Sequence, residues 1–123
     1  MMQETHPGHI ETTETLLRLY VFLIQFIDRC QDEAARKTYP EEELQAHLAT
    51  TRAKVHDITK VNPVVQAKVE KECERMLTLG ARCLKGGTEK VSALDVLDAE
   101  RTILKSKTIA LSDLLAVFRA QYA

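Results

Sequence analysis

The chain has 123 residues, of which 45% are hydrophobic and 28% are charged, and its formal net charge is -1. A chain of this length suggests one domain with a real core, and its near-neutral charge predicts no long-range attraction to nucleic acid or to an anionic membrane surface. Because glycine and proline are scarce, with 4 and 3 residues respectively, the composition favours an all-α fold.

The N-terminal segment, residues 1–11, is a polar lead-in that reads MMQETHPGHIE. Pro7 and Gly8 predict a break in any helix there, so we expect this segment to be flexible. His6 and His9 within it are suitable ligand types for zinc. Because the Pro-Gly pair prevents a fixed helical spacing, we expect a polar tail here rather than a metal site.

The first predicted helix begins at Thr12 or Thr13, because either hydroxyl can cap a first turn. Its apolar residues recur at steps of four and three, namely Leu16, Tyr20, Leu23, Ile27, Cys30 and Ala34. Further apolar residues cover most of the remaining surface, which is typical of a helix buried on several sides. We therefore expect this helix to be the central element, and Tyr39-Pro40 to end it.

The second predicted helix has Pro40 in its first turn, followed by glutamates at the positive end of the helix dipole. Its apolar stripe is thin and consists of Leu44, Leu48, Val55 and Ile58. Small alanines fill much of the remaining surface, so we expect one side of this helix to be exposed.

The third predicted helix has a clear start and a clear end. Asn62 and Pro63 form a capping residue and a first-turn residue. Gly86 and Gly87 predict a left-handed termination. Gly80 inside the helix costs about 1 kcal/mol relative to alanine, which indicates close packing at that position.

The fourth predicted helix begins near Ser92 and Asp95, which resemble a capping box. One face of it carries a seam at steps of three and four, namely Leu94, Leu97, Arg101, Leu104, Thr108, Leu111, Leu115, Phe118 and Tyr122. Two polar seam positions leave two alternatives, an unbroken helix or a break near residue 107. We favour the unbroken helix, because no glycine or proline interrupts it. The prediction is a four-helix bundle over residues 12–123, or five helices if the last one breaks, with a long C-terminal amphipathic helix.

The cysteines, Cys30, Cys73 and Cys83, fall in the apolar stripes, where a free thiol packs as a small hydrophobic group. An odd cysteine count and a polar start without a signal-peptide pattern predict reduced thiols in the cytoplasm. The densest apolar run is far shorter than the ~20 residues that span a bilayer, so we expect no membrane partner.

The histidines of the second helix, His47 and His56, are nine residues apart in the sequence and therefore lie on opposite faces. We expect both on the surface. The chain has no metal-binding or phosphate-binding motif that would indicate an enzyme or a cofactor. Its basic residues are scattered without interleaved aromatic residues, so we expect no nucleic-acid binding. One alternative is a histidine-centred signalling domain, in phosphotransfer or metal sensing, with Lys54 and Lys60 beside His56.

The remaining feature is an excess of apolar helical surface. It predicts a small cytoplasmic protein-interaction module without catalysis, such as an adaptor, a chaperone or a sequestering regulator. Its C-terminal helix would bind a protein partner or a second copy of the chain. The candidate partner-binding residues are Leu111, Leu114, Leu115, Phe118 and Tyr122. The alternative is that these residues belong to the protein's own core.

Overall fold

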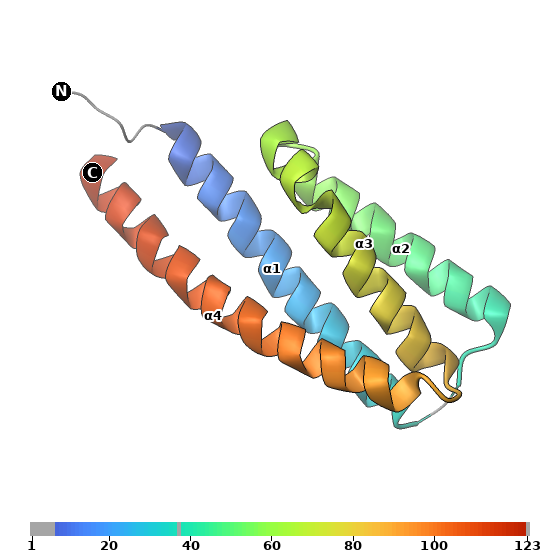
Figure 1. Cartoon of the computed structure of the whole chain (residues 1–123). Helices are drawn as coiled ribbons and strands as arrows, with labels where there is room; N and C mark the ends of the chain where they lie inside the picture. Colours follow the sequence, from blue (N-terminus) through green and yellow to red (C-terminus); the bar gives the residue numbers. More distant parts are fainter. Residues whose placement is uncertain (1–6, 37, 123) are drawn as a thin grey trace.

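The computed structural model describes residues 7–36 and 38–122 of the chain. It contains four α-helices, α1 (Pro7–Ala34), α2 (Glu41–Thr59), α3 (Pro63–Lys85) and α4 (Lys90–Tyr122). Successive helices run in opposite directions and form an up-and-down bundle (Figure 1). The predicted all-α four-helix bundle is confirmed. α4 is continuous, so the alternative of a break near residue 107 is wrong.

α1 is the central helix, as predicted, because it contacts each of the other three. α1 and α3 together form the middle of the bundle. α2 and α4 lie on opposite sides of this pair (Figure 1), with no contact between them in the described part of the chain. α4 therefore has only α1 and α3 to cover it, and the rest of its surface faces outward.

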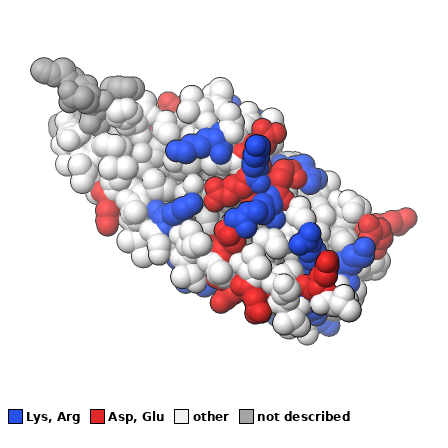
Figure 2. All heavy atoms as spheres, in the orientation of Figure 1, with Lys and Arg blue, Asp and Glu red and all other residues white. Residues whose placement is uncertain are grey.

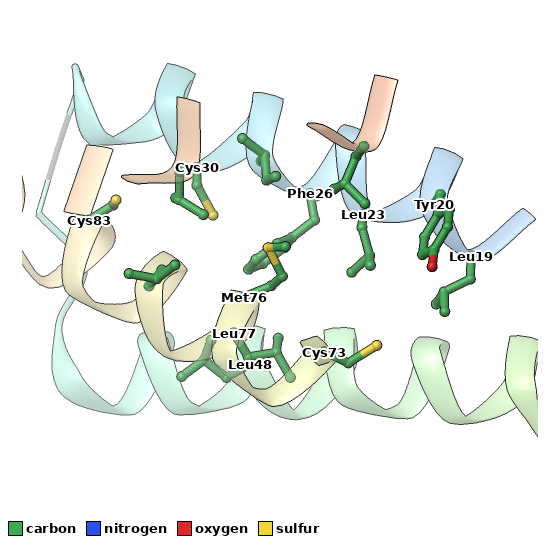
Figure 3. Packing of buried hydrophobic residues seen from close by; sticks show 14 of the residues in the cluster. Leu19, Tyr20, Leu23, Phe26, Cys30, Leu48, Cys73, Met76, Leu77 and Cys83 are labelled. Carbon is green, nitrogen blue, oxygen red and sulfur yellow. The ribbon is translucent and has the colours of Figure 1, made fainter. Parts of the chain in front are cut away.

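The core runs along α1 and draws side chains from all four helices. In Figure 3, Phe26 of α1 and Met76 of α3 point toward one another, and Leu77 of α3 lies beside Leu48 of α2. The largest fully buried side chains include Leu19, Leu23, Ile27, Met76, Leu84, Leu97 and Leu104. Burial of each such side chain contributes about 1.5–3 kcal/mol.

The start of α1 differs from the prediction. The helix begins at Pro7, whereas the sequence predicts a start at Thr12 or Thr13. Proline is suited to the first helical position, so Pro7 starts the helix and does not break one. The Thr13 hydroxyl donates to the His9 carbonyl at 2.7 Å, as it does inside a helix, and does not cap a first turn. The predicted flexible lead-in is therefore helical from Pro7 onward, and residues 1–6 lie outside the described residues.

The end of α1 and the start of α4 also differ. α1 ends at Ala34, before Tyr39-Pro40, and Tyr39 N–H donates to the Leu84 carbonyl at 3.0 Å. The chain therefore leaves the helix early enough for this loop to reach α3. α4 begins at Lys90, because Ala93 N–H already donates to the Glu89 carbonyl at 2.9 Å. Ser92 consequently lies within the first turn and is not the capping residue.

The predictions for α3 are confirmed. The Asn62 side chain accepts a hydrogen bond from Val65 N–H at 3.3 Å, and Pro63 opens the helix. Gly86 and Gly87 follow the helix with φ angles of 82° and 89°, which glycine adopts at little cost. Gly80 lies at the contact between α3 and α1.

Candidate functional site

The seam that the sequence predicts on α4 faces the rest of the bundle. Its leucines Leu97, Leu104 and Leu115 are buried, while Leu94 and Leu111 are half-buried against the core. We call this face the inner seam. Its polar interruptions are also accommodated within the bundle, since the guanidinium of Arg101 pairs with the Asp28 carboxylate of α1.

The five predicted partner-binding residues do not lie on one surface. Leu115 is only 5% exposed and Leu111 packs against the core, whereas Leu114 is 41% exposed on another side of α4. Phe118 is half-buried, and the side chain of Tyr122 lies outside the described part of the chain. Of the predicted set, only Leu114 is both described and open to a partner.

The last turns of α4 are held against the first turns of α1. The Arg119 guanidinium lies 2.6 Å from the Glu14 carboxylate. The ring centroids of Phe118 and His9 are 5.8 Å apart. Both side chains of the ion pair are largely exposed, so we assign it only about 0.2–1 kcal/mol. These contacts fix which face of α4 is turned inward and which is turned outward.

A second seam runs along the outward face of α4, and we call it the outward seam. Its positions recur at steps of three and four, which places them on one side of the helix. All of them are exposed and none is charged. The outward seam consists of Ser92, Val96, Ala99, Ile103, Ser106, Ala110, Leu114, Val117 and Gln121.

The large residues of the outward seam are well exposed. Val96, Ile103, Leu114 and Val117 have exposed fractions of 39%, 48%, 41% and 53%. The helical periodicity of the sequence does not single out this face, because the larger leucines of the inner seam dominate the pattern. The sequence marks the outward seam by an absence of charge, since none of its positions between residues 92 and 121 is Asp, Glu, Lys or Arg.

Outside the outward seam, positively and negatively charged side chains are intermingled on the surface. On the face shown in Figure 2, Lys and Arg intermingle with Asp and Glu over the middle of the bundle, while the end that carries both termini has few of either. Several charged side chains of the bundle are paired across helices, such as Arg52 with Glu74 at 2.8 Å and Arg75 with Glu100 at 2.6 Å. This mixture gives the face in Figure 2 no broad patch of one sign.

All three cysteines are buried, which confirms the prediction that they pack in the apolar stripes. Burial raises the pKa of Cys30 to about 12 and that of Cys73 to about 11, and it also raises the pKa of Cys83. The thiolate is the reactive form of cysteine. At neutral pH these side chains are thiols, so their setting is that of packing residues.

His47 is not the surface residue that the sequence predicts. It is half-buried, and its ring stacks near those of Phe26 and Tyr39, with centroids 6.2 and 5.9 Å apart. The difference arises from the loop between α1 and α2, which brings Tyr39 against His47 while the Tyr39 N–H donates to the Leu84 carbonyl of α3. Sequence periodicity within one helix carries no information on such a loop.

His56 is exposed, as predicted, on the opposite side of α2. Its Nδ1 lies 3.2 Å from the side-chain nitrogen of Gln66, at a groove of about 470 Å³ between α2 and α3. Arg52 and Glu74 line the same groove. Across the described residues, no three or more His, Cys, Asp or Glu side chains are grouped as metal ligands.

Comparisons with known proteins give no match to a family model, a curated protein or a solved structure. In the part of the chain that the structure describes, no helix combines the length and apolar character needed to cross a membrane. The surface of the bundle itself is therefore the basis for a proposed function.

Proposed function

We propose that this protein is a small cytoplasmic protein-interaction module, without catalysis of its own, that binds through the outward face of α4. The observation that carries the proposal is the outward seam, which is exposed and uncharged from Ser92 to Gln121. A helix with an uncovered apolar face is a docking surface for a second helix. The buried thiols also suit a reducing compartment such as the cytoplasm.

The bundle presents the outward seam in a rigid form. The inner seam packs on α1 and α3, and the ion pairs of Arg101 with Asp28 and of Arg119 with Glu14 add further contacts to α1. A partner therefore binds a helix that is already ordered, which avoids the entropy cost of folding it on binding. Covering the exposed half of each large seam residue contributes about 1 kcal/mol per side chain.

Two isoleucines of α4 provide a matched test. Ile103 belongs to the outward seam, whereas Ile109 is more exposed, at 65%, but lies off it. Because Ile109 neighbours the seam position Ala110, it points about 100° away around the helix. We expect Ile103→Glu to lose the proteins that co-purify with the tagged chain, and Ile109→Glu to retain them. An identical set of bound proteins for both variants and the unaltered chain would contradict the proposal.

A second candidate is a histidine-centred phosphotransfer domain, and the exposed ring of His56 beside a groove favours it. An imidazole nitrogen is a competent nucleophile toward a phosphoryl donor. Radiolabel transferred from a phosphoryl donor to the chain, and absent from His56→Gln, would support this role. Equal labelling of both proteins would exclude His56 as the acceptor.

A further inference from the structure

Two copies of the outward seam complement each other when their α4 helices run in opposite directions. An antiparallel pairing of two copies of α4, centred between Ser106 and Lys107, sets eight of the nine seam positions opposite one another and brings the two copies of Ser106 together near the centre. The opposing positions are then Ser92 with Gln121, Val96 with Val117, Ala99 with Leu114, and Ile103 with Ala110. At the two inner pairs a large side chain meets an alanine, which is the arrangement that fills space between close helices without voids.

We propose that the outward seam binds the same seam of a second copy of this chain, with the two α4 helices antiparallel. This inference rests on the proposed function and names its partner. A parallel pairing would set each residue against itself, so that a helix separation that suits Ile103 and Leu114 would leave gaps at Ala99 and Ala110. The size pattern therefore favours the antiparallel arrangement.

The charges that border the outward seam permit this pairing. Lys107 is the charged residue nearest the centre, and its ammonium turns toward its own bundle, 3.6 Å from the Glu72 carboxylate and 5.6 Å from the centroid of the Tyr20 ring. Glu100, which would lie level with Asp113 of the second copy, is bound to Arg75 at 2.6 Å. The charges of Lys107 and Glu100 are thus compensated within one chain before the two copies meet.

The contact is large enough for a specific dimer. The outward seam spans residues 92 to 121, which corresponds to about 45 Å of helix at 1.5 Å per residue. A contact strip about as wide as a helix, about 10–12 Å, then covers roughly 500 Å² per copy. The total, roughly 1,000 Å², is about the minimum area of a specific interface and fits a weak dimer with a dissociation constant in the micromolar range.

Three exposed serines of α4 allow a cross-linking test of the pairing. Ser106 lies at the centre of the outward seam, Ser92 lies at its end, and Ser112 is exposed but lies off it. In the antiparallel dimer, position 106 of one copy lies within about 1.5 Å, along the helix, of position 106 of the other. The two copies of position 92 are about 40 Å apart. The native cysteines do not compete, since all three are buried.

The experiment combines light scattering with air oxidation of single-cysteine variants at a protein concentration of about 100 µM. We expect the reduced full chain to have twice the mass of the 13.9 kDa polypeptide. On oxidation, Ser106→Cys should form a disulfide-linked dimer, while Ser92→Cys and Ser112→Cys should remain largely uncross-linked. Cross-linking of Ser92→Cys at least as efficient as that of Ser106→Cys would overturn the antiparallel arrangement.

A monomer at this concentration would overturn the inference. The proteins bound by Ile103→Glu and Ile109→Glu then show whether the proposed function fails as well. If the chain is monomeric but Ile103→Glu still loses a bound protein that Ile109→Glu retains, only the identity of the partner is wrong. If the chain is monomeric and neither variant changes what is bound, the inference and the proposed function both fail.

Discussion

Gly80 of α3 lies directly against the Phe26 ring of α1. A Cβ placed on Gly80 would be 2.5 Å from Cζ of Phe26 and 3.1 Å from Sγ of Cys30. This contact sets the close approach of the two central helices, because the ring occupies the space that any side chain at position 80 would need.

Replacement of Gly80 by alanine should therefore destabilise the bundle. Helix propensity alone would stabilise the variant by about 1 kcal/mol. Overpacking of a filled core opposes this gain and typically costs about 1–3 kcal/mol. We expect a net loss in the free energy of unfolding, measured by urea denaturation. In the background of Phe26→Leu, Gly80→Ala should cost less, and additive effects in this double-mutant cycle would show that the two residues are not coupled.

Adjacent leucines of α4 should respond in opposite ways. Leu115 is 5% exposed in the inner seam, while Leu114 is 41% exposed in the outward seam. We expect Leu115→Ala to lower the free energy of unfolding by about 2–5 kcal/mol. Leu114→Ala should cost less than about 1 kcal/mol when unfolding is measured at a concentration too low for association. Equal losses for the two variants would mean that α4 is not oriented as described.

The buried thiols should make stability fall at high pH. The pKa of Cys30 is raised from 9.0 to about 12 by burial, and that of Cys73 from 9.0 to about 11. Above pH 9 the unfolded chain releases these protons while the folded chain keeps them, so ionisation favours unfolding. Their contribution is complete below pH 9 and is lost as the pH rises toward 11–12. Burial also raises the pKa of Tyr20, which adds to the same trend.

The measurement is the free energy of unfolding between pH 8 and 11, in reductant, for the full chain and for Cys30→Ala. We expect a decline above pH 9 that is shallower in the variant. A thiol reagent at pH 8 should also label the native protein far more slowly than the unfolded protein. Rapid labelling of Cys30 in the native state would contradict its burial.

Asn62 should stabilise the turn between α2 and α3 in two ways. Its side chain accepts from Val65 N–H at 3.3 Å and donates to the Thr12 hydroxyl of α1 at 3.0 Å. We expect Asn62→Ala to cost about 1–2 kcal/mol, because the cap and this contact are lost together. Thr12→Val removes only the second hydrogen bond and should cost less. If the two variants lose equal stability, the cap contributes nothing.

The sequence predicts the end of a helix well wherever neighbouring residues alone determine it. Asn62-Pro63 and Gly86-Gly87 locate both ends of α3, because capping and left-handed geometry depend on neighbouring residues alone. The predicted break at Pro7 is wrong, because proline occurs both where a helix is broken and in its first turn. Which of these applies depends on whether the following turn is stabilised by tertiary contacts, and α4 supplies such a contact through Phe118, whose ring lies near that of His9 in α1.

The candidate site was only partly predictable. The inner seam follows from the periodicity of large apolar residues, and the structure turns it toward α1 and α3. The outward seam is marked by small and medium side chains such as Ala99 and Ser106, whose individual hydrophobic signal is weak. Its significance depends on the absence of contact between α2 and α4 in the described residues, which leaves this face of α4 uncovered. That arrangement is a property of the whole bundle and cannot be read from one helix.

Sedimentation velocity over a range of concentrations measures the proposed binding of the outward seam of α4 to a second copy of the chain. The samples are the full chain, Ile103→Glu and the off-seam control Ile109→Glu, each with its helix content verified by circular dichroism. We expect the full chain and Ile109→Glu to associate with rising concentration, while Ile103→Glu stays monomeric and fully helical. Identical sedimentation of all three proteins would contradict the proposed binding.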